Sequence, residues 1–519
     1  MKSDHGKLKK AIGLPMLIAI GLSGVIGSGI FILPASLAAT AGPGMLIAIL
    51  FAGLIAAVLA LAYAELGAAF PVTGGPFSFP RLALGDLGGF LMGWGYFLYL
   101  FIGTAAIANI FVVYLGFYLP GLTASGALTP LGIIFALLFV WLLTVVNILG
   151  VRWGGLYAVV MTVGRLIPLL FFCIVGLMAL KKGVLHPFLP FGWEGVTLAV
   201  ALFFWSYTGF EAVVVPIEEV KNPGKTIPWA MMMTVLLTIV IYVLIGIAFL
   251  GMVDWAALGL HQGEWGKLIA LDAPLAEVVR SSSAWLAAFI AVGALLATGG
   301  AIGSWILVQG RLPFAMARNE LFWSKMGKIG RLGTPVFSLI FSSALTSIVI
   351  IFIPHFVSLS LIASITAIVP YAAAALAVPI LRQTRSEVVR PFALPLPHVV
   401  AIAAFIFATW LIYWAAWPWT CIGIILFLIG LFAFLFVPNK AFEWKRNVWL
   451  FAYLVGIAAC SFLGGSEDTL IEDVAFPRPL GWLTLPYDLV ALSLFAIAIY
   501  IWAYLANVRV KLKRESSQI

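Results

Sequence analysis

The sequence predicts an all-α polytopic membrane protein, and three observations support that prediction. Of the 519 residues, 63% are hydrophobic and 9% are charged, whereas soluble domains carry about 25% charged residues. The apolar residues fall into fourteen runs. Each run is long enough to cross a bilayer as a helix, which takes roughly 20 residues. Two of the runs are interrupted near their middle by small polar residues, and one of these interruptions also carries an acid.

The first ten runs form two blocks of five. We expect helices at 12–38, 44–70, 86–118, 127–149 and 154–180, and again at 196–219, 226–251, 285–316, 336–354 and 358–381. The two blocks occupy 12–180 and 196–381. Together they form a predicted core at 12–381.

The rest of the apolar sequence predicts four more helices, at 398–415, 418–437, 447–464 and 486–507. The stretch 398–437 is nearly continuous, and "WPW" at Trp417–Trp419 divides it, so a single long helix is the alternative there. These additional helices occupy 382–508. Short tails at 1–11 and 509–519 complete the chain.

The net charge of +9 is distributed as in an oriented membrane protein. Alternate loops between the apolar runs are basic, whereas the others, except for Lys181 and Lys182, are uncharged or acidic, as at 252–284. By the positive-inside rule, the basic side faces the cytoplasm, which places both termini there and the protein in the cell membrane. Because the basic residues lie in short loops, we expect a lipid bilayer and no nucleic acid as the partner. The loop at 252–284 is long enough to hold a short surface helix.

The first interrupted run contains "GLSGVIGSGIF" at Gly21–Phe31, and the second contains "WSYTGFE" at Trp205–Glu211. Non-helical backbone at membrane depth is tolerated only where protein or a watery cavity surrounds it. Interrupted helices at corresponding positions of two halves indicate an inverted-repeat transporter with its binding site at the midplane. The alternative is that the small residues only allow helices to pack closely.

The two interruptions have complementary chemistry. The N–H groups of Gly27, Ser28 and Gly29 would begin a second half-helix, whose positive dipole end suits a carboxylate. The carbonyl groups of Phe204, Trp205 and Ser206 would end a first half-helix, and they suit an ammonium group. A ligand that carries both groups is an α-amino acid.

Three stretches identify a resemblance: "SGVIGSGIFILPASLA", "AYAELGAAFPVTGGPFSF" and "FFWSYTGFEAVVVPIEEVKNPGKTIP", in that order. The chain resembles the amino acid–polyamine–organocation (APC) transporters over roughly residues 10–440. The resemblance implies a LeuT-type fold of two inverted five-helix repeats, with helices 1 and 6 broken. The last two helices are similar to an additional pair found in some members.

Within that family the chain is most similar to the arginine/agmatine antiporter and its basic amino acid relatives. The resemblance implies a carboxylate site at Ser23, Gly27, Ser28 and Gly29, an amine and side-chain site at Phe204, Trp205, Ser206, Gly209, Thr104, Trp305 and Ala363, and gating or proton coupling by Tyr96, Glu211 and Tyr371. Trp305 would stack on the substrate side chain. An aromatic ring there suits a guanidinium, a cationic amine or an apolar side chain.

Three positions depart from the antiporter's pattern. Thr104 stands in place of an asparagine, Ala363 in place of a serine, and Gly24 in place of another asparagine. Fewer polar side chains are therefore available here to hydrogen-bond a guanidinium group. A neutral or apolar substrate side chain remains open.

Arg165 lies inside the fifth predicted helix, where a charge is costly and usually functional. The resemblance implies that many proton-coupled and exchanger members of the family place a lysine here, beside the break in helix 1. An arginine stays charged, so we expect Arg165 to be a fixed cation that fills a sodium site and makes sodium coupling unlikely. The alternative is that its long side chain snorkels to the membrane surface.

Glu211 is the candidate for proton coupling, because it is an acid in the middle of a broken helix. Its alternative role is that of a permanent partner for a buried cation or hydroxyl group. We find no catalytic signature such as GxSxG or HExxH, so an enzyme is not expected. The scattered histidines predict no metal site, and no cofactor is expected.

The sequence therefore predicts a secondary amino acid transporter that works by alternating access, either as an exchanger or as a proton symporter. A polyamine or cationic amino acid antiporter is the alternative substrate class. A channel is disfavoured because it would need a filter or a ring of charges. A homodimer is left open as the assembly.

Overall fold

A computed structural model describes residues 12–70, 75–124, 126–149, 154–180, 184–415, 417–437, 443–464 and 478–516. The α-helices are α1 (Leu14–Val25), α2 (Gly29–Ala41), α3 (Met45–Ala69), α4 (Gly75–Gly116), α5 (Pro130–Leu149), α6 (Gly154–Met178), α7 (Gly192–Tyr207), α8 (Pro223–Met252), α9 (Pro274–Arg280), α10 (Ala284–Arg318), α11 (Val336–Phe352), α12 (Phe356–Thr384), α13 (Pro397–Trp414), α14 (Trp419–Leu435), α15 (Trp444–Gly464) and α16 (Tyr487–Ser516). Short 3₁₀ helices are η1 (Gly42–Gly44), η2 (Phe210–Val214), η3 (Ile217–Glu219), η4 (Trp265–Ala270) and η5 (Ser324–Gly327), and the two strands β1 (Thr123–Ala124) and β2 (Ala127–Leu128) pair antiparallel.

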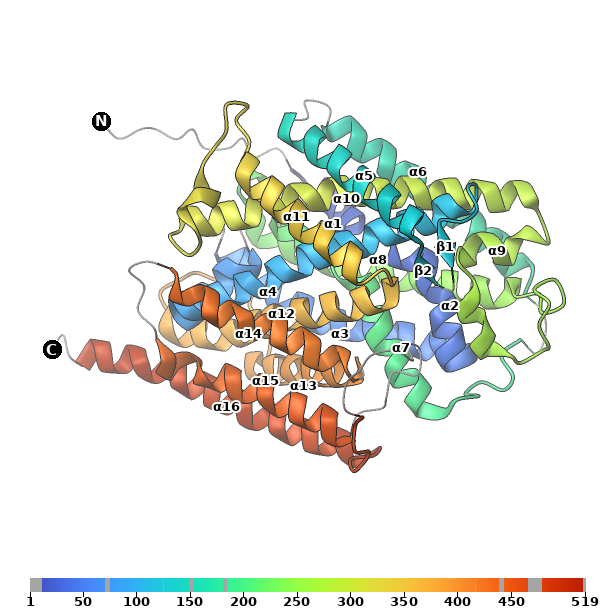
Figure 1. Ribbon diagram of the computed structural model, residues 1–519. Helices are drawn as coiled ribbons and strands as arrows, with labels where there is room; N and C mark the ends of the chain where they lie inside the picture. Colours follow the sequence, from blue (N-terminus) through green and yellow to red (C-terminus); the bar gives the residue numbers. More distant parts are fainter. Residues whose placement is uncertain are drawn as a thin grey trace.

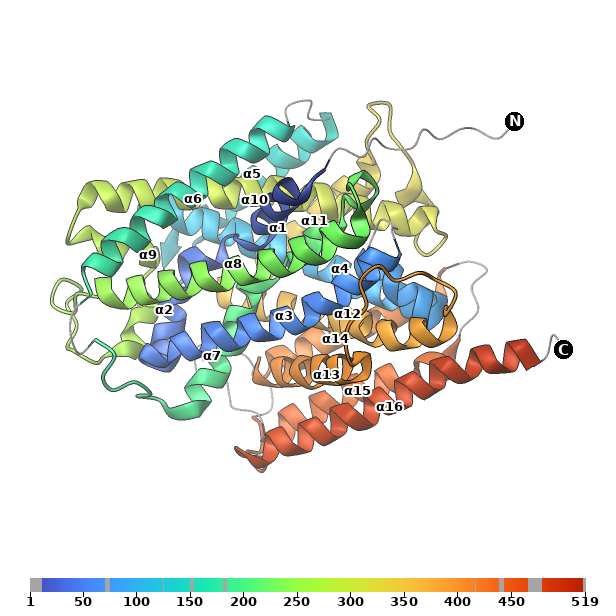
Figure 2. The same ribbon diagram turned by 180° about the vertical axis from the view of Figure 1, so that it is seen from behind.

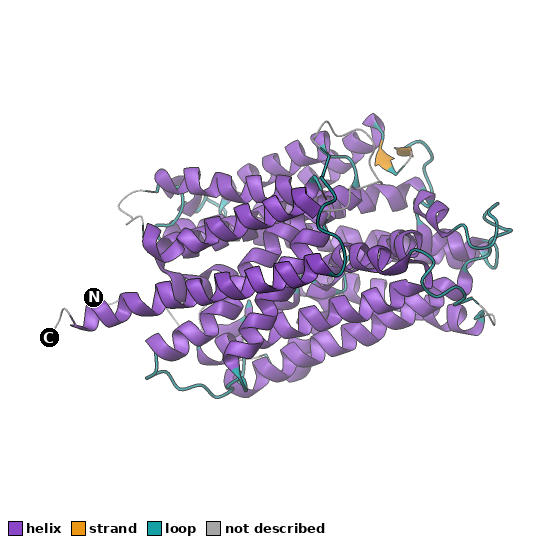
Figure 3. Cartoon of the chain, turned by 90° about the horizontal axis from the view of Figure 1, so that it is seen from below, coloured by secondary structure: helices purple, strands orange, loops and turns teal. Residues whose placement is uncertain are grey.

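The helices lie side by side in one elongated bundle (Figures 1 and 2). Figure 1 shows the end of α16 and the α10–α11 connection at one end of the bundle, whereas α9 and the strand pair lie at the other. Viewed from below, the long helices keep nearly the same direction (Figure 3). We call the first of these ends the basic end, because the α10–α11 connection carries Arg318, Lys325, Lys328 and Arg331.

Burial divides the helices into inner and outer ones. The most apolar part of α12 is entirely buried and that of α4 is 89% buried, whereas those of α5 and α16 are 28% buried. α4 and α12 pack against each other along much of their length, and α3, α10, α13 and α14 pack around them. The buried pair forms the centre of the bundle, and the apolar outer faces of α5 and α16 suit contact with lipid.

The all-α polytopic membrane fold is confirmed. Within the described residues, ten helical stretches are long and apolar enough to cross a membrane, and four shorter apolar helices accompany them. Each of the fourteen predicted runs contains one of these helices. The 252–284 loop contains two short helices: η4 has exposed residues, as expected of a surface helix, whereas most of α9 is buried. The tail at 1–11 and residues 517–519 lie outside the described residues, and the division into repeats stays a prediction.

α4 contains the third predicted helix from residue 86 onward, preceded by a helical part from Gly75 that the sequence did not predict. Its backbone is interrupted at Gly85, where φ is 83°, a conformation that only glycine adopts readily. Arg446 and Asn447 of α15 donate hydrogen bonds to the carbonyl groups of Ala83 and Leu84, at 2.9 and 3.3 Å. These bonds satisfy carbonyl groups that the interruption would leave unpaired, and they join the additional helices to the core.

Candidate functional site

The first predicted interruption is present between α1 and α2. Helix α1 ends at Val25, residues 26–28 are non-helical, and α2 begins at Gly29. Ser28 precedes α2, and its side chain does not cap the helix. A Cβ atom on Gly27 would meet nothing closer than 3.8 Å, so ligand atoms can approach the backbone here. The N-terminus of α2 thus has the geometry of an anion site.

The second interruption separates α7 from η2. Thr208 is extended, and Gly209 has a φ of 101°, which again requires glycine. The carbonyl oxygen of Trp205 accepts hydrogen bonds from Thr208 N at 3.2 Å and from Thr208 Oγ1 at 2.6 Å. Thr208 therefore already engages one of the three carbonyl groups predicted for an ammonium group.

The two interruptions touch each other through their backbones. A Cβ atom on Gly209 would lie 2.4 Å from the carbonyl oxygen of Gly24, and one on Gly24 would lie 2.7 Å from the carbonyl oxygen of Gly209. Gly24 is therefore needed for this close approach. The hydroxyl group of Tyr242 on α8 lies 3.1 Å from Val25 O and 2.9 Å from Ser206 O, so it bridges the two broken helices.

A cavity of about 240 Å³ lies where the interruptions meet. The predicted site residues that line it are Ser23, Gly27, Ser28, Gly29, Tyr96, Arg165, Trp205, Ser206, Gly209, Glu211 and Trp305. Ligand pockets for drug-sized molecules measure about 300–1,000 Å³, so this cavity suits a single small metabolite. Val215, which also lines it, is 51% exposed, so the cavity reaches the surface on the side of η2.

Aromatic rings form one wall of the cavity. The ring centroid of Tyr99 lies 4.9 Å from that of Trp305 and 6.0 Å from that of Trp205, and the two tryptophan rings are 5.7 Å apart. Leu100, Ile107 and Val308 extend the same lining with aliphatic side chains. A substrate side chain placed here contacts aromatic and apolar groups.

Glu211 is buried, with 1% of its surface exposed. Its carboxylate oxygens accept hydrogen bonds from the Tyr96 hydroxyl group at 2.8 Å and from Gly209 N at 3.1 Å. Tyr371 faces the same carboxyl group from α12. No ion pair to Glu211 is formed by the described residues, but the Tyr96 hydroxyl group is a buried partner of the kind that the alternative role requires.

Arg165 of α6 is 4% exposed and points to the end of α1. Its guanidinium group donates to the carbonyl oxygen of Ser23 at 3.0 Å and to Ser23 Oγ at 2.5 Å. A cation suits this position because the C-terminal end of α1 is the negative end of its dipole. The described residues contain no group of three or more His, Cys, Asp or Glu side chains placed to hold a metal ion.

Four predicted site residues do not line the cavity: Phe204, Thr104, Ala363 and Tyr371. Thr104 is fully buried, and its hydroxyl group donates to Leu100 O and Gln309 Oε1, each at 2.8 Å. Phe204, Ala363 and Tyr371 are fully buried as well. The structure thus brings together both helix interruptions, Arg165, Glu211 and the tryptophans, but leaves these four in the surrounding packing.

Two tyrosines at the site were missed by the sequence prediction. Tyr99 forms part of the aromatic wall, and Tyr242 joins the broken helices. The sequence could have pointed to Tyr242, because it is a lone tyrosine in the apolar run of α8 and a buried tyrosine needs a hydrogen-bond partner. Tyr99 lies three residues after Tyr96 and so falls on nearly the same helix face.

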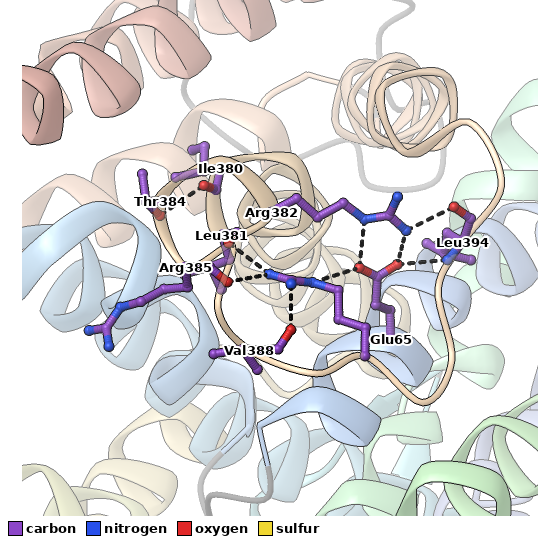
Figure 4. A network of polar contacts seen from close by, with 9 residues as sticks. Glu65, Ile380, Leu381, Arg382, Thr384, Arg385, Val388 and Leu394 are labelled. Carbon is purple, nitrogen blue, oxygen red and sulfur yellow. Dashed lines mark hydrogen bonds and ion pairs between the residues drawn. The ribbon is translucent and has the colours of Figure 1, made fainter.

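A second polar cluster lies between α3, α12 and the segment that follows α12 (Figure 4). Arg382 donates to both oxygens of the buried Glu65 carboxylate, at 2.8 and 2.6 Å, and Leu394 N donates at 2.8 Å. Arg390 lies 3.7 Å from the same carboxylate and donates to the carbonyl oxygens of Leu381, Arg385 and Val388. We call these contacts the Glu65 cluster; they fasten the end of α12 to α3.

The broken helices, the cavity between them and the apolar bundle define a polytopic membrane protein with a central cavity. The chain belongs to the amino acid permease family, whose model matches residues 12–460. It is 27% identical to the aspartate-proton symporter of Bacillus subtilis over 96% of this chain and 97% of that protein. It is 28% identical to the branched-chain amino acid permease BcaP of the same organism (84% of this chain, 95% of that one) and 30% identical to its methylthioribose transporter (82% and 95%).

Proposed function

We propose that the protein is a secondary transporter that moves an α-amino acid with an uncharged side chain across the cell membrane by alternating access. The observation that carries this proposal is the cavity in which the N-terminus of α2, the end of α7 and Glu211 meet. The N–H groups of Gly27–Gly29 bind the carboxylate, and the carbonyl groups near Ser206 bind the amine. Both termini are cytoplasmic in this proposal, and the core is a five-plus-five inverted repeat.

An unpaired hydroxyl group supports this assignment of the amine and carboxylate site. Ser206 Oγ is buried, lines the cavity, and has no hydrogen-bond partner among the described residues. It is close to the start of α2, since a Cβ atom on Gly29 would lie 2.4 Å from it. Buried polar groups are normally satisfied, so a bound ligand is expected to supply its partner.

The side-chain subsite supports an uncharged substrate. Leu100, Ile107 and Val308 line it beside the aromatic wall. The Thr104 hydroxyl group donates to Gln309 Oε1 and Leu100 O, so it does not offer its hydrogen atom to a substrate. A charged side chain would lose its hydration against these apolar groups, and the two charged groups that border the cavity, Glu211 and Arg165, already make hydrogen bonds with Tyr96 and Ser23. The branched-chain amino acid permease among the relatives agrees with this assignment.

Proton coupling through Glu211 is the finer part of the proposal. Glu211 borders the cavity and bonds to Tyr96 and to the turn at Gly209, so a change in its protonation alters contacts on α4 and at the break between α7 and η2. Arg165 occupies the end of α1, which disfavours sodium there. One relative is a proton symporter by name.

Uptake into proteoliposomes tests these assignments. Labelled leucine, methionine and phenylalanine are expected to enter faster with an inward proton gradient and to be indifferent to sodium. Glu211→Gln should flatten the pH dependence while substrate binding remains measurable by thermal shift. Failure of every amino acid to exchange or to stabilise the protein would refute the transporter proposal. Sodium-dependent uptake would refute the role of Arg165.

A cationic amino acid or polyamine is the second candidate substrate. The observation in its favour is that Glu211 and the indole rings of Trp205 and Trp305 line one cavity, because acids and aromatic faces attract cations. Counterflow with arginine, agmatine and putrescine distinguishes the two candidates. Preferential exchange of these cations over leucine would favour the second one. Preferential exchange of aspartate would instead point to Arg165 as a ligand for acidic side chains.

A further inference from the structure

A second cavity, of about 310 Å³, lies on the outside of the bundle and away from the candidate site. We call it the aromatic groove. It is lined by Phe90 and Trp94 of α4, Phe322 and Trp323 of the α10–α11 connection, Phe341 of α11, and Ile429, Phe432, Ala433, Phe436 and Val437 of α14 and the residues after it. We propose that this groove binds one acyl chain of an anionic phospholipid, whose head group is held by Lys325 and Lys328.

The floor of the groove is buried and apolar. Phe90 is fully buried and packs on Phe322 at 6.1 Å and on Phe434 at 5.2 Å between ring centroids. Trp94 donates its indole N–H to Leu426 O at 3.0 Å, so its polar atom is already satisfied. A hydrocarbon chain in the groove therefore leaves no hydrogen-bonding group of this indole unpaired.

The rim of the groove is formed by exposed aromatic side chains. Phe432 is 69% exposed and Phe436 is 75% exposed, on the last turns of a helix whose outer face is apolar throughout. Trp323 is 56% exposed on the opposite rim. Tryptophan is typical of the membrane–water boundary, so the groove extends from that boundary into the hydrocarbon region.

Positive charge lies at the same boundary. Trp323 begins the tight turn of η5, in which Met326 N donates to Trp323 O at 2.9 Å, and Lys325 lies within that turn. Lys328 follows it directly, and both lysine side chains are exposed. Residues 318–331 hold four basic residues and one acidic residue. A phosphate head group at this boundary meets a positive surface.

The charge decides which occupant is favoured. An acyl chain is surrounded by apolar groups both in the bilayer and in the groove. Apolar contact alone therefore provides little selectivity between lipids. Selectivity must then come from the lysines. A second copy of the chain is disfavoured, because a two-fold interface would bring the same basic rim of both copies together.

The test uses the purified full-length protein in a neutral detergent. Thermal unfolding is followed while phosphatidylglycerol or phosphatidylcholine with identical acyl chains is added. We expect phosphatidylglycerol to raise the melting temperature at lower lipid concentrations than phosphatidylcholine does. Each lysine near an anionic membrane surface contributes about fivefold in affinity, so Lys325→Gln with Lys328→Gln should shift the phosphatidylglycerol titration about 25-fold and remove the preference.

Two further variants complete the test. Lys221 and Lys225 form an exposed lysine pair at the start of α8, and their replacement by glutamine should leave the preference intact. Ala433→Phe fills the groove and should abolish the response to both lipids. Equal responses to the two lipids in the unchanged protein, or equal losses in the two lysine pairs, would overturn the proposal. A dimer by light scattering that Ala433→Phe converts to a monomer would assign the groove to a second copy instead.

Discussion

The hydroxyl group of Tyr242 lies 2.9 Å from the carbonyl oxygen of Ser206 at the end of α7. The same hydroxyl group lies 3.1 Å from the carbonyl oxygen of Val25 at the end of α1. One hydroxyl hydrogen serves one acceptor at a time, so the second carbonyl group keeps capacity for another donor. An ammonium group is such a donor, and Tyr242 therefore couples the proposed amine site to both broken helices.

Replacing Tyr242 with phenylalanine is expected to destabilise the protein and to slow transport. The variant leaves a buried carbonyl group without its donor, which costs about 1–3 kcal/mol, and it removes the bridge between the breaks. Thermal unfolding and counterflow measure the two effects. Tyr207→Phe is the matched control, because Tyr207 donates to Ile49 O at 3.0 Å away from the cavity. Equal transport losses in both variants would contradict the coupling role.

Gly24 and Gly27 are expected to respond differently to alanine. At Gly24 the added methyl group would lie 2.7 Å from Gly209 O and from Ala212 Cβ, and overpacking of this kind costs about 1–3 kcal/mol. At Gly27 nothing lies closer than 3.8 Å. Gly24→Ala should therefore lower the melting temperature, whereas Gly27→Ala should keep it and raise the KM for transport.

The reverse pattern, with Gly27→Ala unstable and Gly24→Ala unaffected, would contradict the backbone contact between the two interruptions. Normal transport by Gly27→Ala would contradict the carboxylate site. The two variants together thus separate the packing role of the glycines from the binding role.

The sequence predicted the fourteen helices because bilayer thickness imposes their length. It also located both interruptions, because clustered glycine and serine residues weaken a helix wherever they occur. It could not show that Gly24 meets Gly209 or that Tyr242 bridges them, since helical periodicity does not specify which distant backbone atoms touch. Thr104 illustrates the same limit: its hydroxyl group bonds to Gln309, 205 positions away in the chain.

The loop helix α9 gives a prediction for pH dependence. Burial raises the pKa of the Glu277 carboxyl group, although a hydrogen bond from Ala273 N at 2.7 Å opposes the shift. A carboxyl group with a raised pKa favours folding most below its unfolded pKa of about 4.3, and that contribution is lost as the pH rises through the folded pKa. Glu277→Gln keeps an acceptor for Ala273 N, so amide exchange in α9 should become slower at neutral pH and stay unchanged in acid.

Glu264 is the control for that experiment, because its pKa is shifted in the opposite direction. A hydrogen bond from Lys267 at 2.7 Å lowers the pKa of Glu264, so its contribution is present above the unfolded pKa and is lost as the pH falls. Glu264→Gln should therefore speed amide exchange in η4 at neutral pH. Faster exchange in both variants at neutral pH would contradict the burial effect at Glu277.

The Glu65 cluster is expected to hold the end of α12 and the segment after it in place. Glu65→Gln leaves Arg382 and Arg390 facing a neutral group, and removal of one partner from a buried ion pair costs about 3–5 kcal/mol. Because the Arg382 side chain is 26% exposed, water screens part of that loss, and we expect about 2–3 kcal/mol. Thermal unfolding measures the total, and amide exchange at 385–396 should increase most.

Arg385 supplies the matched control for Glu65→Gln. Figure 4 shows its side chain pointing away from Glu65, and its carbonyl oxygen, which accepts from Arg390 at 3.0 Å, remains in any variant. Arg385→Gln should change stability by less than about 0.5 kcal/mol. The double variant Glu65→Gln/Arg382→Gln completes the comparison. If its loss in the free energy of unfolding equals the sum of the losses in the two single variants, the residues act independently and the cluster does not fasten α12 to α3.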